Sequence, residues 1–124
     1  MNATVSHFLE HLRQRNQQPE LGRDFISWSG LMLRVHRSLD DEKPLHYELT
    51  WPLLSDPSVS IYPLLLCECV LGHEFHYPSF TERAANFIHL GSPYTERWQD
   101  REIHVHTENT NVLLRITSVA PENG

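Results

Sequence analysis

The first regular pattern of apolar and polar positions along the chain is helical. Apolar residues recur at spacings of three and four within residues 4–15, which places them on one face of a helix: Val5, Phe8, Leu9 and Leu12. Asn2 or Thr4 can cap the start of this helix, and the polar run before Pro19 ends it. The chain is therefore predicted to open with one amphipathic helix.

From Phe25 the period of the pattern changes to two residues. A strand at 25–28 is followed by a Ser-Gly turn signal and by a second strand at 31–36, in which apolar and polar residues alternate. Residues 40–44 (DDEKP) have the composition of a turn, and residues 45–51 repeat the alternation. These segments predict a three-stranded antiparallel meander with one apolar face and one face toward water.

The most apolar stretch, residues 61–71, does not reveal its secondary structure by periodicity. A buried helix and a fully buried strand both give a continuous apolar run. Ser60 before the run and Gly72 after it favour a helix of about ten residues, and a strand remains the alternative. Residues 73–77 then read as a short strand.

The last third of the chain contains one predicted helix and one hairpin. Residues 79–82 (SFTE) match a capping box, in which the serine accepts a hydrogen bond from the glutamate amide, and a helix follows as far as Gly91. Residues 92–98 read as a loop or a helical turn. Strands at 101–107 and 112–119 form the hairpin.

Together these elements predict a single α+β domain over residues 1–124. Its antiparallel sheet has about five or six strands, and its helices pack on one face. Residues 1–3 and 120–124 are expected to fray. The terminal strands of the meander or the hairpin are expected to form the sheet edges, where a second subunit could pair to give a homodimer.

Composition narrows the possible partners. The chain carries 16 acidic and ten basic residues, so its formal net charge is −6, which argues against binding nucleic acid or an anionic membrane. No apolar run reaches the ~20 residues of a membrane helix, and the first residues lack the pattern of a secretion signal. We therefore expect a cytoplasmic protein, with Cys67 and Cys69 as reduced thiols in the core.

The chain has nine histidines, and some have spacings that suit a metal ion. His104 and His106 lie two residues apart on a predicted strand and share a face, which suits zinc, iron or nickel. Glu74 and His76 would share a face of the short strand at 73–77, with His73 on its other face. A metal site requires His104 and His106 to meet either Glu74 and His76 or His89 in the fold.

The sequence contains no complete catalytic set, no phosphate-binding glycine loop and no nucleophile elbow. The expected function is therefore non-enzymatic binding of a protein partner, as an adaptor, an inhibitor or a chaperone-like dimer, with no cofactor. Four aromatic residues could anchor such an interface: Trp28, Trp51, Tyr94 and Trp98. The alternative is a metal-dependent enzyme or metal-binding protein that uses the histidines described above.

Two parts of the sequence resemble known families. The string GHEFHY at residues 72–77 resembles a segment in the amidotransferase domain of cobyrinic acid synthases, over six residues only, and no residue role is transferred from it. In size, in charge and in an opening helix followed by a three-stranded meander, the chain is similar to small acidic chaperones and adaptors of bacterial secretion systems. That family closes with a helix, where this chain is predicted to close with a hairpin.

Overall fold

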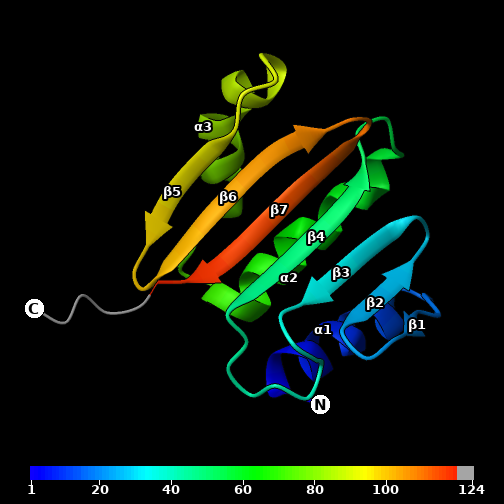
Figure 1. Cartoon of the computed structure of the whole chain (residues 1–124). Helices are drawn as coiled ribbons and strands as arrows, with labels where there is room; N and C mark the ends of the chain where they lie inside the picture. Colours follow the sequence, from blue (N-terminus) through cyan, green and yellow to red (C-terminus); the bar gives the residue numbers. More distant parts are fainter. Residues whose placement is uncertain (120–124) are drawn as a thin grey trace, which may run out of the picture.

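A computed structural model of the chain describes residues 1–119 as one antiparallel sheet with three α-helices on one of its faces (Figure 1). The α+β class is confirmed. The elements in chain order are α1 (Ala3–Gln14), β1 (Glu20–Leu21), β2 (Phe25–Trp28), β3 (Leu31–Val35), β4 (His46–Pro52), the 3₁₀ helix η1 (Pro57–Ser60), α2 (Ile61–Leu71), α3 (Tyr77–His89), β5 (Tyr94–Trp98), β6 (Arg101–Glu108) and β7 (Asn111–Ser118).

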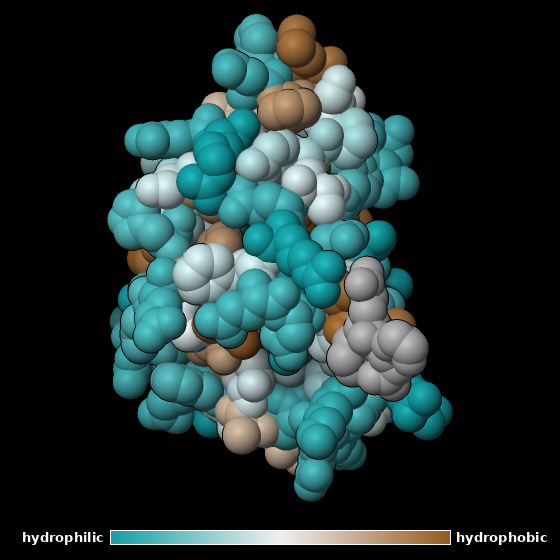
Figure 2. Space-filling view, turned by 90° about the vertical axis from the view of Figure 1, so that its left-hand side faces the viewer, coloured by the Kyte–Doolittle hydropathy of each residue, from teal (hydrophilic) through white to brown (hydrophobic). Residues whose placement is uncertain are grey.

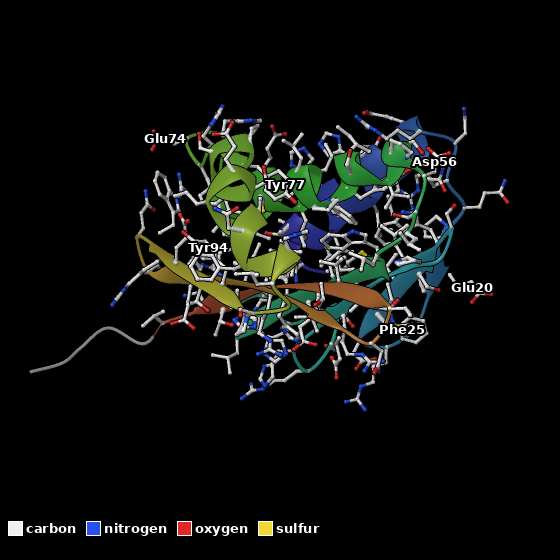
Figure 3. All side chains as sticks on the ribbon, turned by 90° about the horizontal axis from the view of Figure 1, so that it is seen from above. Glu20, Phe25, Asp56, Glu74, Tyr77 and Tyr94 are labelled. Carbon is white, nitrogen blue, oxygen red and sulfur yellow. The ribbon has the colours of Figure 1, made fainter. Side chains whose placement is uncertain are left out.

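The sheet has seven strands in the order β1-β2-β3-β4-β7-β6-β5, so it consists of two antiparallel meanders joined at their last strands. The join is the pairing of β4 with β7, in which Leu49 lies opposite Leu114 and Tyr47 lies opposite Ile116. Residues 53–93, which contain α2 and α3, connect the two meanders and fold back over one face of the sheet (Figures 1 and 3).

The core lies between the sheet and the helices, because alternate residues of every long strand point to the same side. The apolar face predicted for the first helix is buried as a whole, since Val5, Phe8, Leu9 and Leu12 are each at most 2% exposed. The stretch at 61–71 is helix α2, which supports the helical alternative, and α1 packs against it. Among residues 1–119, none of the helices has both the length and the apolar character needed to cross a membrane.

The short strand predicted at residues 73–77 is wrong. These residues form a turn that leads into α3, and Phe75 in the turn is buried against the rings of Phe80 and Trp98. Helix α3 begins two residues before the predicted capping box, because His76 takes the N-cap position and Pro78 lies in the first turn. Proline suits that position, where its missing amide hydrogen costs no hydrogen bond.

The sheet edges also differ from the prediction. Both strands of the terminal hairpin lie inside the sheet, and the edges are β1 and β5, neither of which is evident from the sequence. Strand β1 is only two residues long. Strand β5 follows Pro93, which is a loop signal, and carries two charged residues among its five.

Asn2, within the three residues that were expected to fray, makes the contacts that hold the start of α1. Asn2 is 5% exposed, and its Oδ1 accepts a hydrogen bond from the backbone amide of Val5 at 2.7 Å. Its Nδ2 donates to the carbonyl oxygen of Asp41 at 2.9 Å, and its backbone amide donates to the carbonyl oxygen of Leu39 at 2.8 Å. Asn2 therefore caps α1 and joins it to the loop before β4. The predicted fraying of 120–124 lies outside the described residues.

Replacing Asn2 with alanine should lower the free energy of unfolding by about 1 to 2 kcal/mol, because the substitution removes both the helix cap and the bond to Asp41. Urea unfolding followed by circular dichroism measures this change. The control is Ser6→Ala on the exposed side of α1, which should stay within about 0.5 kcal/mol of the parent. Equal losses in the two variants would contradict the capping role.

Candidate functional site

The helices cover one face of the sheet, and the other face, which we call the outer face, carries two groups of polar side chains that contact each other. Side chains rich in nitrogen and oxygen project from it on the side away from the helices (Figure 3). Directly paired residues on neighbouring strands share a face, so the strand registers align one residue from each of β3, β4, β7, β6 and β5. This central row consists of Arg34, Glu48, Arg115, His104 and Thr95.

The middle of the central row is an ion pair across the join between the two meanders. Arg115 donates from Nε to Oε1 of Glu48 at 2.9 Å, and the Glu48 side chain is 23% exposed. His46 Nε2 lies 3.7 Å from the same carboxylate oxygen. The ring of His46 also lies beside that of His36, with centroids 5.1 Å apart. The carboxylate of Glu48 therefore has neighbours from two strands, Arg115 of β7 and His46 of β4.

A second polar chain runs from β5 to β6 through His104 and His106, which we call the histidine pair. Thr95 Oγ1 lies 2.8 Å from His104 Nδ1, and His104 Nε2 lies 2.8 Å from His106 Nδ1. Glu108 Oε2 lies 3.7 Å from the remaining ring nitrogen, His106 Nε2. A hydrogen bond between the two rings requires one proton between the facing nitrogens. One of these nitrogens therefore carries the proton, and the other is unprotonated and accepts the bond.

The surroundings of His104 and His46 lower the pKa of both rings. Burial lowers the pKa of His104, and the nearby His106 and Arg115 lower it further, while Glu102 acts in the opposite direction. Burial also lowers the pKa of His46, with a smaller contribution from His36 in the same direction. Neutral imidazole can accept a hydrogen bond or bind a metal ion, whereas imidazolium cannot.

The residues expected to complete a metal site do not reach the histidine pair. Glu74 lies in the turn between α2 and α3, on the helical side of the sheet, with the sheet between it and the outer face (Figure 3). His76 caps α3, where its Nδ1 lies 2.6 Å from Ser79 Oγ. His73 Nδ1 lies 3.9 Å from Glu68 Oε1. Of the five predicted residues, only His104 and His106 come together.

No group of three or more potential metal ligands occurs within residues 1–119. The prediction failed at 73–77 because these residues are not a strand, so the alternation on which the pairing of Glu74 with His76 was based does not apply. The part of the prediction that used the alternation of a real strand, β6, placed His104 and His106 correctly on one face.

The four aromatic residues expected to anchor an interface pack toward the core. Trp28 is 4% exposed, and its ring lies against those of Phe8 and Tyr62. The others are half-buried and pack against the core cluster: Trp51, Tyr94 and Trp98. They lie on the inner side of their strands, so they stabilise the fold and expose only part of their surface to a partner.

The cysteines are poor nucleophiles. Cys67 is buried, and its burial raises the pKa of its thiol far above the usual value. Cys69 is partly buried, and burial raises its pKa to about 11. A thiol with such a pKa carries almost no thiolate at neutral pH.

The free edge strand β5 is a feature that the sequence did not reveal. Its one charged residue on the core side, Glu96, accepts from Arg83 Nε and Nη2 of α3 at 2.9 and 2.8 Å, and from the Tyr94 hydroxyl at 2.8 Å. The hydrogen bonds from Arg83 lower the pKa of Glu96. The alternation of aromatic and polar residues in YTERW was the available signal.

Lowering the pH from 7.5 to 5.5 should reduce the free energy of unfolding. His46 and His104 have a lower pKa in the folded chain than the ordinary value of about 6.5, so the unfolded chain binds more protons as the pH falls through that value. Chemical unfolding at several pH values measures the effect. His104→Gln should make the fall smaller, whereas His89→Gln, at an exposed position of α3, should leave it unchanged. A flat profile for the parent chain would contradict the expectation.

Comparison of the chain with protein-family models, with curated proteins and with solved structures gives no match. The features that its own geometry defines are the outer face with the histidine pair and the free edge of β5.

Proposed function

We propose that this chain binds a protein partner without catalysis, by accepting an extended segment of that partner alongside β5. The observation that carries the proposal is that, within residues 1–119, no strand pairs with the outer side of β5. An edge strand presents unpaired backbone amide and carbonyl groups, and pairing with another chain satisfies them.

The two edges of the sheet differ in how well they can accept a further strand. Strand β1 has two residues and follows Pro19, which cannot donate a backbone hydrogen bond. Strand β5 has five residues with no proline among them. An unpaired charge that points inward commonly blocks such an edge, but Glu96 is already bound by Arg83 and Tyr94.

Exposed apolar side chains lie beside β5 on the helical side. Phe87 of α3 is 43% exposed and its ring lies 5.0 Å from that of Tyr94, while Leu90 just after α3 is 77% exposed. Figure 2 shows the molecule from the side of the β5 edge, where hydrophilic side chains cover most of the surface and apolar ones lie at the top, near the end of α3. A partner strand could place alternate apolar side chains there.

The partner can be another protein or a second copy of this chain. An antiparallel pairing of β5 with itself, centred on Glu96, would place two carboxylates opposite each other. The Arg83 of each copy already pairs with its own carboxylate, which reduces the repulsion. One backbone substitution tests both kinds of partner.

The backbone groups of Thr95 and Arg97 are the ones that face outward. A two-residue turn, Gln99-Asp100, joins β5 to β6, so Trp98 and Arg101, which flank it, form a hydrogen-bonded pair. Because hydrogen-bonded and non-hydrogen-bonded pairs alternate along an antiparallel ladder, Thr95 and Arg97 direct their amides away from β6.

Replacing Arg97 with proline should abolish partner binding, because it removes one outward amide hydrogen without breaking the β5–β6 ladder. Arg97→Ala is the matched control, since it removes the same side chain and keeps the amide. Each variant is purified under native conditions from the source cells, which shows whether a heterologous partner stays bound. Light scattering then gives the molar mass, which shows whether the chain forms a homodimer. Both variants should unfold within about 1 kcal/mol of the parent.

If the proline variant keeps the same stoichiometric partner and the same molar mass as the alanine variant, pairing at β5 is wrong. A parent chain that is monomeric and recovers no stoichiometric partner would also overturn the proposal.

A further inference from the structure

We infer that the histidine pair on the outer face is a two-ligand site for a divalent first-row transition metal ion. Its ligands are His104 Nε2 and His106 Nδ1, and Thr95 and Glu108 orient the two rings. This inference is independent of partner binding at β5. It rests on the positions of four side chains from two neighbouring strands.

The two facing nitrogens already have a separation that suits chelation. They are 2.8 Å apart. Two imidazole nitrogens that each lie about 2.0–2.1 Å from one ion are roughly 2.9 to 3.4 Å apart in right-angled or tetrahedral geometry. The rings must therefore turn so that both lone pairs meet at the ion, while the distance between the nitrogens changes little. The ring planes differ by 61°.

Each outward ring nitrogen has a side-chain oxygen nearby, within hydrogen-bond distance for His104 and at a longer distance for His106. When Nε2 of His104 binds an ion, its Nδ1 carries the hydrogen and donates to Thr95 Oγ1, which lies 2.8 Å away. When Nδ1 of His106 binds, its Nε2 carries the hydrogen and points toward the Glu108 carboxylate at 3.7 Å. A carboxylate or hydroxyl behind a ligating histidine fixes its tautomer and makes it a better ligand.

The charges around the histidine pair also suit a cation. Glu102 and Glu108 on the same strand favour a cation, and Arg115, which is opposite His104 on β7 and opposes a cation, is paired with Glu48 at 2.9 Å. On β5, the residue opposite His104 is the uncharged Thr95, and Arg97 is opposite Glu102. The ion would replace the single proton that the two rings now share.

The site supplies two ligands from the described chain, so water fills the other positions of the bound ion. No third histidine, cysteine, aspartate or glutamate within residues 1–119 completes it. Binding should therefore be reversible and should follow the general order of divalent ions at nitrogen ligands, with Cu²⁺ tightest and Zn²⁺ weaker.

A second pair of histidines has to be removed before this site can be measured. His7 and His11 stack on α1 with ring centroids 4.9 Å apart, and two histidines four residues apart on a helix can also chelate an ion. The rings of His36 and His46 form a further neighbouring pair, with centroids 5.1 Å apart. The experiment therefore uses the untagged chain with His7→Gln and His36→Gln as the parent. Titration calorimetry with CuCl₂ and with ZnCl₂ measures affinity and stoichiometry at pH 7.5.

The parent should bind one ion per chain, with Cu²⁺ at least tenfold tighter than Zn²⁺. Adding His104→Gln or His106→Gln should weaken binding at least tenfold, because either substitution leaves one ligand. Unchanged affinity in both variants would overturn the site. Because a variant could misfold, the parent gives a second readout: Zn²⁺ should shift the ring nitrogen signals of His104 and His106 in NMR spectra, and no shift would also overturn it.

The orienting role of Glu108 has its own test. Glu108→Gln should weaken Zn²⁺ binding about tenfold, as expected when the group behind a ligating histidine is lost. Glu102→Gln is the matched control, because it removes the same charge from the same face of β6 and does not contact His106. Equal weakening in both variants would show that Glu108 acts only through its charge and would remove its orienting role.

Discussion

The pairing of β4 with β7 is the interaction on which the rest of the structure depends. It joins two meanders that would otherwise be separate small sheets, and it brings Tyr47 and Leu49 beside Ile116 and Leu114 in the core. The helices between the two meanders have a continuous surface to cover only when this pairing is made. The ion pair of Glu48 with Arg115 spans the same join on the outer face. Side-chain contacts on both faces of the sheet therefore hold β4 and β7 together.

A sheet that is covered on one face has to satisfy polar side chains on the other. In this chain, they are satisfied across strands: a carboxylate with a guanidinium, and one imidazole with another. These contacts depend on register, because a shift by one residue would move every one of them to the core side. The chemistry of the outer face and the pairing of the strands are therefore set by the same geometry.

The sequence predicted the parts of this fold that have strong periodicity. Helix α1, strands β2 to β4 and the β6–β7 hairpin follow from spacing alone, and His104 and His106 were placed on one face because β6 is a strand. The turn at 73–77 was missed because its aromatic and charged residues follow one another in a pattern that resembles the alternation of a strand. Its structure depends on the burial of Phe75 against Trp98, a residue more than 20 positions further along the chain.

The edge strands were missed for a related reason. An edge strand is paired on one side only and is short and polar, which is also the description of a loop. Strand β5 becomes a strand because β6 is there to pair with it and α3 supplies Arg83 for its carboxylate. The features that carry the proposed function are thus fixed by tertiary contacts, so local sequence reveals them only weakly.

The position of β7 has a consequence for synthesis. It follows the other six strands of residues 1–119 in sequence, yet it lies inside the sheet, third from the β5 edge and next to the central strand β4. During synthesis, β1 to β6 therefore leave the ribosome before β7, the strand that joins the two meanders. Until residue 118 has emerged, β4 and β6 each expose an unpaired side, and the nascent chain has to be protected from pairing with its neighbours during that interval.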